Sequence, residues 1–296
     1  MILALDWGNS NLRVAVLAED GTVLRSITTA DGAAGLSGTG FAEVLKHVRE
    51  RLSAQTLPAL ACGAVGAREG WREAPYVSLP AKPDAVARHL VEVPEAALHI
   101  VPGLCHSAPP RAILRGEETQ LLGLGLAGGP PDAIVCLPGT HSKWVQLASG
   151  EVQGFRTYMT GELFALACRH THLAADGDAD DAEGFNEGLG RVDADTPLSA
   201  SLFGLRADRI LGGLPSGQSR AALAGLLIGS EVAHALAMAK GQPIILCGEP
   251  AMMRRYAVAL ARHGVCAEQK DGAAAAWIGL AQIARLAGIA KASAPA

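Results

Sequence analysis

The chain has 296 residues, of which 49% are hydrophobic and 18% charged, and its formal net charge is −4. This composition excludes a disordered chain, and a sequence without a basic block argues against a nucleic-acid-binding surface. The length suffices for one large or two medium domains with hydrophobic cores of their own. Six widely spaced cysteines without a C-x-x-C pair suggest neither zinc sites nor disulfides, and Cys62, Cys136 and Cys247, in or just after apolar runs, favour small buried thiols.

The N-terminus passes directly into an apolar run without a basic start, so the sequence predicts no signal peptide. The most apolar long stretch, 221–239, contains Glu231 and His234. It therefore predicts a buried helix rather than a membrane span. With the cysteine usage, these observations predict a cytoplasmic protein that does not bind membranes.

Residues 1–18 contain the first pattern that points to a function. The apolar run 2–5 predicts a strand buried on both faces, and it stops at Asp6. Residues 8–10, Gly-Asn-Ser, predict a turn with exposed backbone N–H groups. A second strand is predicted over 12–18, and an Asp-Gly turn then predicts a third over 23–28.

A carboxylate at the tip of a buried strand, beside a glycine turn, suits a hydrated Mg²⁺ and a phosphate. Mg²⁺ takes only one or two carboxylates and keeps much of its water. Gly8 allows a phosphate to approach the main chain, and successive N–H groups can form an anion-binding nest. An ordinary hairpin in which Asp6 caps the turn is the other interpretation of this local pattern.

The next segments predict the rest of an α/β domain. A helix that begins at residue 39 or 40 carries an apolar stripe to Leu52, and a strand is predicted over 57–62. The following loop, 63–76, lies where α/β proteins place ligands. Trp71 and Tyr76 in this loop suit the two faces of a small polyol, and Arg68 or Arg72 suits a carboxylate. A surface loop held by two buried aromatic residues is the alternative.

A second group of acids begins a helix further along the chain. A short helix over 83–90 and a strand over 99–101 come first, and Gly116 then marks a break. Glu117 and Glu118 follow in the first helical turn, where the helix dipole favours acids. A carboxylate on a rigid helix start can also act as a general base toward a hydroxyl in a cleft.

The strongest linker signal is Gly-Gly-Pro-Pro at 128–131, which predicts domains over 1–130 and 131–296. The second half begins like the first, with a strand (133–137), a polar turn (138–142) and two further strands (143–148 and 152–158). This duplication predicts an α/β protein with two facing domains that clamp a nucleotide between them.

The second polar turn differs from the first because Pro138 stands where an acid is expected. Thr140, His141 and Lys143 can instead donate hydrogen bonds to phosphate oxygens. A helix follows, with Thr160 as its predicted N-cap, and its N-terminus can face the transferred phosphate.

Acids at 176, 178, 180 and 187 match four positions of a calcium loop, but Asp181 stands where that loop requires glycine. An acidic surface loop or lid is the favoured interpretation. Helices are predicted over 201–211, 221–239 and 251–263. A buried strand begins at Ile244, and Gly248 after it allows a flat adenine or ribose to lie on the backbone. The closing helix, 273–286, is expected to pack back on the first domain.

Taken together, these stretches resemble the 2-keto-3-deoxygalactonate kinase (2-dehydro-3-deoxygalactonokinase) family, within the superfamily of sugar kinases, hexokinase, heat-shock chaperones and actin. The resemblance rests on motifs spread over nearly the whole chain: Asp-Trp-Gly at 6–8 with Asn11 and Arg13, residues 65–76, Arg-Gly-Glu-Glu-Thr-Gln-Leu-Leu-Gly at 115–123, Leu-Pro-Gly-Thr-His-Ser-Lys-Trp at 137–144, and Met-Thr-Gly-Glu-Leu-Phe at 159–164. Ala67 and Glu69 depart from the family, which more often has Ser and Gln there.

The resemblance implies two ribonuclease-H-like domains of the actin and hexokinase type. It also implies transfer of the γ-phosphoryl group of ATP, with Mg²⁺, to the 6-hydroxyl of a six-carbon 2-keto-3-deoxy sugar acid in galactonate breakdown. Asp6 is expected to hold Mg²⁺ through water, with Glu118 as first and Glu117 as second candidate for the general base.

Two sets of binding residues complete these expectations. The nucleotide and phosphate set is Gly8, Asn9, Ser10, Asn11, Gly139, Thr140, His141, Lys143 and Gly248. The substrate set is Arg13, Arg68, Trp71, Tyr76 and Arg115, in which Arg68 or Arg13 is expected to bind the substrate carboxylate.

Two alternatives remain from the sequence. The opening at Asp6 also resembles that of type III pantothenate kinases, and a sugar-sensing protein on the same fold would bind its ligand without turnover. A homodimer is compatible with the sequence.

Overall fold

The computed structural model describes residues 1–126, 132–173 and 177–289. Its contacts divide the chain into a first unit, Met1–Ala133 with Val145–Phe155 and Asp271–Ala296, and a second unit, Ile134–Trp144 with Arg156–Lys270. The predicted linker at 128–131 lies outside the described residues, so the boundary near residue 130 stays a prediction. Each unit is described by itself below.

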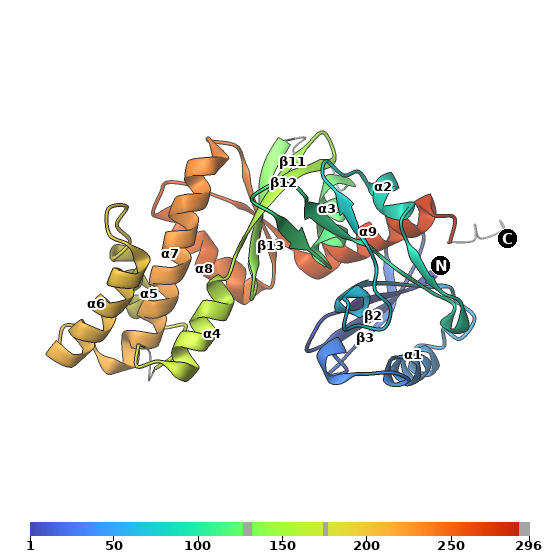
Figure 1. The fold of residues 1–296 in the computed structure, drawn as a ribbon, viewed down its shortest axis with the longest axis horizontal. Coiled ribbons are helices and arrows are strands. Elements are labelled where there is room, and N and C mark those ends of the chain that lie inside the picture. The colour runs from blue at the N-terminus through green and yellow to red at the C-terminus, as the bar shows by residue number, and fades with distance from the viewer. Residues whose placement is uncertain (127–131, 174–176, 290–296) are drawn as a thin grey trace. The chain divides into compact units, whose positions relative to one another are not determined.

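The first unit is built on a six-stranded sheet in the order β3-β2-β1-β4-β7-β6 (Figure 1). Its strands are β1 (Ile2–Trp7), β2 (Leu12–Leu17), β3 (Val23–Thr29), β4 (Ala59–Gly63), β6 (Val91–Val93) and β7 (Leu98–Ile100). Strand β1 pairs antiparallel with β2 and parallel with β4. The sequence of β1 is a nearly continuous apolar run because this central strand is covered on both faces.

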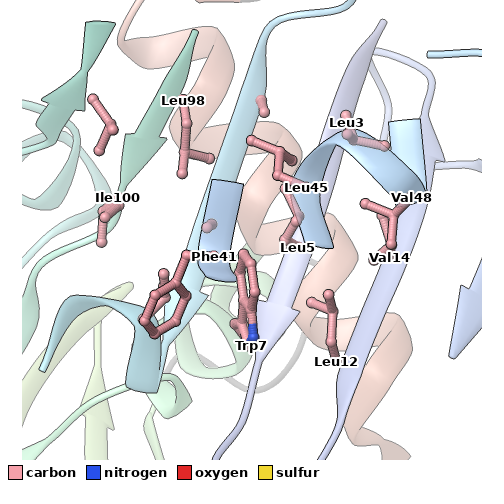
Figure 2. Close-up of a cluster of buried hydrophobic side chains, with 14 of the residues drawn as sticks. Leu3, Leu5, Trp7, Leu12, Val14, Phe41, Leu45, Val48, Leu98 and Ile100 are labelled. Atoms are coloured by element: carbon pink, nitrogen blue, oxygen red, sulfur yellow. The ribbon is translucent and has the colours of Figure 1, made fainter. Parts of the chain in front are cut away.

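One face of this sheet is covered by α1 (Gly40–Arg51), whose apolar stripe was readable in the sequence. Phe41, Leu45 and Val48 on this helix are buried against side chains from β1, β2 and β7 (Figure 2). The Trp7 ring is fully buried and meets Phe41 edge-on, with 5.3 Å between ring centroids. This core fixes the end of β1, where the first polar turn begins.

Two helices far apart in the sequence, α3 (Glu117–Leu126) and α9 (Gly272–Leu286), pack closely in the same unit (Figure 1). A Cβ placed on Gly123 would stand 1.9 Å from the Ala275 carbonyl oxygen, and one on Gly279 would stand 1.9 Å from that of Thr119. Only glycine allows the two backbones this approach. Since α9 also contacts β1, the chain's last described helix holds α3 near the end of that strand.

The second sheet has the order β12-β11-β10-β13-β14. Its strands are β10 (Asp132–Leu137), β11 (Ser142–Ala148), β12 (Glu151–Tyr158), β13 (Ile244–Gly248) and β14 (Glu268–Asp271). This order repeats β3-β2-β1-β4-β7 of the first sheet, and β10 pairs parallel with β13 as β1 does with β4. The structure confirms the predicted α/β class and the duplication.

The second unit contains α4 (Thr160–His170), α5 (Ala182–Gly190), α6 (Leu198–Leu211), α7 (Ser219–Ala239) and α8 (Pro250–Ala261). By length and composition the helix 216–239 could cross a membrane, but two thirds of its apolar window (67%) is buried inside the fold. A core helix has this property, as the sequence predicted for 221–239.

Glycines bring α5 against α7. A Cβ on Gly188 would stand 2.0 Å from the Ala222 carbonyl oxygen, and one on Gly225 would stand 2.1 Å from that of Phe185. The sequence did not predict α5, because glycine disfavours helix. The acidic loop or lid predicted over 176–187 is thus wrong for its second half.

Asp181 is the N-cap of α5, where its side chain accepts a hydrogen bond from the Gly184 N–H at 2.7 Å, and Glu187 lies on the helix itself. Asp176 lies outside the described residues. Within the described residues no group of three or more His, Cys, Asp or Glu side chains could hold a metal ion.

Other local predictions need smaller corrections. Thr160 is the first residue of α4 rather than its N-cap, which is Met159. The helix predicted over 83–90 ends early, as α2 (Pro83–Ala87). A three-stranded sheet of β5 (Tyr76–Ser78), β8 (Gly103–His106) and β9 (Ala112–Leu114) was not predicted, because its strands of three or four residues are too short to show periodicity.

Candidate active site

Asp6 lies in the central strand β1, between its two neighbours β2 and β4. Within the sheet it stands opposite Arg13 of β2 and Cys62 of β4. The Arg13 Nη1 atom is 3.3 Å from Asp6 Oδ2, and the Cys62 Sγ is 3.9 Å from Asp6 Oδ1. Burial raises the pKa of Asp6 above its usual value, and the Arg13 charge opposes this effect. The carboxylate is nevertheless reachable, since 20% of its side chain is exposed.

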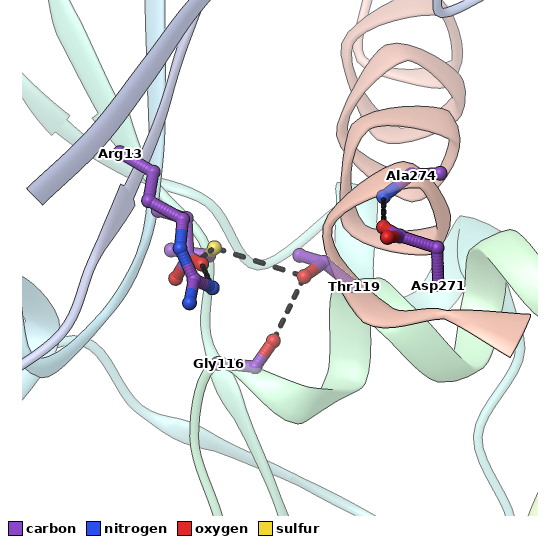
Figure 3. A network of polar contacts seen from close by, with 7 residues as sticks. Arg13, Gly116, Thr119, Asp271 and Ala274 are labelled. Carbon is purple, nitrogen blue, oxygen red and sulfur yellow. Dashed lines mark hydrogen bonds and ion pairs between the residues drawn. The ribbon is translucent and has the colours of Figure 1, made fainter. Parts of the chain in front are cut away.

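A chain of weaker contacts joins this carboxylate to the start of α3. The Thr119 hydroxyl is 3.7 Å from Cys62 Sγ and donates to the Gly116 carbonyl oxygen at 2.8 Å (Figure 3). Thr119 and Cys62 are fully buried, and burial raises the pKa of the thiol well above its usual value. Cys62 is therefore a neutral packing group that spaces Asp6 from α3, rather than a nucleophile.

The two acids at the start of α3 have different surroundings. Glu118 is fully buried, and its Oε2 accepts a hydrogen bond from the Gly116 N–H at 2.6 Å. Its Oε1 is buried without a partner among the described residues. Burial raises the pKa of Glu118 to about 8. Glu117 is only partly buried, its Oε2 accepts from the Arg115 N–H at 3.1 Å, and its charge raises the pKa of Asp6. Glu117 therefore belongs to the same electrostatic site as Asp6.

The turn after β1 is held by its backbone and leaves its side chains in solvent. The Gly8 N–H donates to the Asn11 carbonyl oxygen at 3.0 Å, and the Ala34 N–H donates to that of Asn9 at 3.1 Å. Asn9, Ser10 and Asn11 are exposed. Gly32 lies so close that a Cβ would stand 2.2 Å from the Asn9 carbonyl oxygen. The first polar turn is thus a fixed loop with exposed polar groups.

The aromatic residues of the 63–76 loop have structural partners. The Trp71 ring stacks on Phe41 with centroids 5.8 Å apart and meets Trp7 edge-on at 6.3 Å. Tyr76 lies under the Arg115 guanidinium, whose central carbon is 4.4 Å from the ring centroid. The structure thus favours core packing for Trp71, and pairs Tyr76 with a cation.

The arginines predicted to bind substrate differ in how they are held. Arg68 is 81% exposed and stands 3.6 Å from Glu73. Arg115 donates from Nη2 to the Ala74 carbonyl oxygen at 2.6 Å, while its Nε and Nη1 are buried without a partner among the described residues. Arg115 is therefore oriented by the protein, and two of its three side-chain nitrogen atoms have no hydrogen-bond acceptor within the described structure.

In the second unit the residues of the second turn meet the start of α4. The His141 Nε2 atom is 2.6 Å from Glu162 Oε2, and the Lys143 ammonium donates to the His141 carbonyl oxygen at 2.7 Å. A Cβ on Gly161 would stand 2.6 Å from the Gly139 carbonyl oxygen, so the helix start sits directly against the turn. Gly248 is the last residue of β13 rather than the residue after it, and an added Cβ there would approach only Pro138.

The predicted residues therefore fall into two groups, one in each unit. The sequence analysis did not select Cys62, Thr119 or, as part of a site, Glu231. An acid in the apolar stretch 221–239 was the visible signal for Glu231, whereas only the strand register places Cys62 beside Asp6.

The residues around Asp6 fit a hydrated Mg²⁺ better than a fully protein-ligated ion. A cluster of three ligands is not found among the described side chains, but Mg²⁺ needs only one or two carboxylates besides water and phosphate. Asp6 is partly exposed at a strand end, and Glu117 is close enough to influence it electrostatically.

The duplicated strand order, with an acid at the end of the first strand, defines two ribonuclease-H-like domains of the actin and hexokinase class. The family model described as 2-keto-3-deoxy-galactonokinase matches residues 6–283. A Rhizobium meliloti protein assigned as a 2-dehydro-3-deoxygalactonokinase is 38% identical over 293 residues, 95% of this chain and 96% of that protein. The Escherichia coli 2-dehydro-3-deoxygalactonokinase is 38% identical over 234 residues, 78% of this chain and 79% of that protein.

A crystal structure assigned to the same kinases, from Sinorhizobium meliloti, superimposes with a TM-score of 0.88 at 37% identity. The match covers 96% of this chain and 98% of that one. The chain belongs to the 2-keto-3-deoxy-galactonokinase family.

Proposed function

We propose that this protein transfers the γ-phosphoryl group of ATP to the 6-hydroxyl of 2-dehydro-3-deoxy-D-galactonate and acts in the cytoplasm. The observation that carries the proposal is the site in the first unit, where Asp6 shares one electrostatic environment with the start of α3. A kinase needs an anionic ligand for the metal–phosphate group and a carboxylate near the acceptor hydroxyl. The family match places these residues within its span.

In phosphoryl transfer the protein mainly positions groups and balances charge. Asp6 would hold Mg²⁺ through water, and Mg²⁺ when bound would neutralise charge on the phosphates. The proposed cradle consists of the turns 8–11 and 139–143. It supplies exposed side chains and backbone N–H groups in one unit, and His141 and Lys143 in the other.

For the general base we favour Glu117 over Glu118. Glu118 is fully buried, and burial raises its pKa to about 8, so at neutral pH it is mostly protonated. Glu117 is partly exposed and interacts electrostatically with Asp6. A base must come within hydrogen-bond distance of the proton that it removes, which a fully covered carboxylate achieves only after its surroundings move.

For the substrate carboxylate we favour Arg115 among the predicted arginines. Its guanidinium is already oriented by Ala74 and Tyr76, and two of its N–H groups have no partner within the described structure. A carboxylate oxygen that reached one of these buried groups could accept a charge-assisted hydrogen bond from it. Arg68, which is mostly exposed, would lose more side-chain entropy on binding.

The test is product identification. The protein is incubated with ATP, Mg²⁺ and, separately, a set of 2-keto-3-deoxy sugar acids and pantothenate, and each product is assigned by mass and by phosphorus NMR. We expect ADP and a 6-phosphorylated 2-keto-3-deoxy acid. Phosphorylation of pantothenate alone would support the type III pantothenate kinase alternative. Tight binding of a sugar acid without ADP release would indicate a sugar sensor and overturn the proposal.

A further inference from the structure

Beneath the second polar turn lies a buried carboxylate that the proposed reaction does not use directly. Glu231 stands in the middle of α7 and is only 3% exposed. Its Oε2 accepts hydrogen bonds from the Ser142 hydroxyl at 2.8 Å and the Tyr256 hydroxyl at 2.9 Å. Its Oε1 accepts from the Trp144 indole N–H at 2.7 Å. An acid in an apolar helix is thus fully occupied by three neutral donors.

The three donors to Glu231 come from two different elements of the second unit. Ser142 and Trp144 are the first and third residues of β11, immediately after the turn that contains His141. Tyr256 belongs to α8, which approaches from elsewhere in the same unit. Ser142 and Tyr256 are fully buried and Trp144 almost so. The carboxylate therefore ties the end of the turn to two helices, with two of its bonds to the turn side and one to α8.

We propose that Glu231 is a positioning residue for nucleotide phosphates, which holds the turn 138–141 and the start of β11 in their phosphate-binding conformation. This inference rests on the proposed function, because it assumes that the turn contacts ATP. A buried carboxylate needs hydrogen-bond donors to offset its desolvation, so the Glu231 carboxylate and the start of β11 hold each other in place. Ser142 lies between His141 and Lys143, whose own link is the 2.7 Å bond from the Lys143 ammonium to the His141 carbonyl oxygen.

A buried hydrogen-bonded carboxylate could stabilise the fold without affecting nucleotide binding. Variants of its donors can distinguish that role from the proposed positioning of the turn. Ser142→Ala removes one bond on the turn side, whereas Tyr256→Phe removes one bond on the α8 side. Both variants delete a single hydroxyl from the same Oε2 atom, and both side chains are fully buried. They are therefore matched for the bond lost at Oε2, and they differ in whether that bond comes from the start of β11 or from α8; the Tyr256 hydroxyl also interacts with that of Ser142.

The experiment measures MgATP binding by calorimetry, and KM and kcat with ATP and the sugar acid, for the full-length wild type, Ser142→Ala, Tyr256→Phe and Glu231→Gln. We expect Ser142→Ala and Glu231→Gln to weaken MgATP binding about tenfold, a change of about 1.4 kcal/mol in binding free energy, because the turn is no longer held in its binding conformation. KM for the sugar acid should stay unchanged. Tyr256→Phe should lower the melting temperature as Ser142→Ala does, but keep wild-type affinity for MgATP.

Two results would overturn the inference. One is wild-type MgATP affinity in Ser142→Ala, which carries the test even if Glu231→Gln fails to fold. The other is an equal loss of affinity in Ser142→Ala and Tyr256→Phe, which would assign the network to stability. A wild type that binds MgATP but phosphorylates no sugar acid would defeat only the proposed function, since the binding comparison still applies. A wild type that binds no MgATP would defeat both.

Discussion

The two polar turns occupy equivalent places in two sheets of the same strand order, yet their chemistry differs. The first follows β1 and has Asp6 at the strand end, paired with Arg13 and linked through Cys62 to the start of α3. The second follows β10 and begins at Pro138, with His141 in the turn, Lys143 in the following strand β11 and Glu231 buried beneath them. In the first unit the acid, Asp6, is part of the candidate site itself. In the second unit the acid, Glu231, is buried beneath the polar turn.

This difference shows that the two copies of a duplicated fold can carry different functional groups at equivalent positions. Both copies keep the strand–turn–strand backbone at the start of their sheets. The first has a partly exposed carboxylate within its first strand, which suits a hydrated cation. The second presents donors, which suit phosphate oxygens. The two copies therefore present different kinds of groups at equivalent turns, and the predictions below test this division.

The largest expected effect is at the acid of the first turn. Asp6→Asn should lower kcat by roughly 10²–10³-fold, because a charged group that balances phosphoryl transfer is lost while the side-chain volume is kept. Asp20→Asn, in the exposed turn between β2 and β3, is the matched control and should leave kcat unchanged. Steady-state kinetics with circular dichroism as the check of folding measures both. Near-normal turnover in Asp6→Asn would remove the metal–phosphate role of the first turn.

The next effect distinguishes the two acids of α3, which have no counterpart in the second turn. Glu117→Gln should lower kcat by roughly 10²-fold with little change in either KM, as expected of a general base. In Glu118→Gln the kcat should change much less. If instead Glu118 is the base, the wild-type rate should rise with pH through about 8, the value to which burial raises the pKa of Glu118, and this limb should vanish in Glu118→Gln.

A backbone change tests how tightly the second turn is seated on α4. Gly161→Ala would place a Cβ 2.6 Å from the Gly139 carbonyl oxygen and 2.8 Å from the Thr140 Cα, and both are backbone atoms that cannot rotate away. We expect a loss of about 2 kcal/mol in the free energy of unfolding and a raised KM for ATP.

Gly204→Ala on α6 is the control, since an added Cβ there meets nothing within 4 Å. It should stabilise the helix by about 0.5–1 kcal/mol. Unchanged KM for ATP in a destabilised Gly161→Ala would mean that the turn can shift without affecting the nucleotide.

The smallest effect concerns stability against pH in the first unit. The pKa of Glu118 is raised by burial to about 8, above its value of about 4.5 in the unfolded chain. The folded state therefore binds more protons between these values, and stability conferred by this group falls as pH rises from about 4.5 to 8. Urea unfolding at pH 5, 7 and 9 should show that Glu118→Gln loses less stability over this range than the wild type. Parallel losses in both proteins would contradict the buried state of this carboxylate.

The sequence by itself determined the duplication and most of its elements. Strands β1, β2, β3, β10, β11 and β12 and the helices α1, α7 and α9 were predicted to within two residues at each end, because long apolar runs and helical stripes report burial directly. The acid at residue 6, the proline at 138 and the two acids at 117 and 118 were equally visible, since residue type and position along an element are local properties.

Only the tertiary structure decided which side chains meet. The pairing of Asp6 with Arg13 and Cys62 depends on the register of three strands, and the three donors to Glu231 come from segments that are 25 to 89 residues away in the chain. Helix α5 was hidden because its glycines disfavour helix and yet are needed for its packing on α7. Secondary-structure propensity depends on each residue and its neighbours in the sequence. The burial of a charged group depends on packing between distant segments, and this burial sets its pKa and its role.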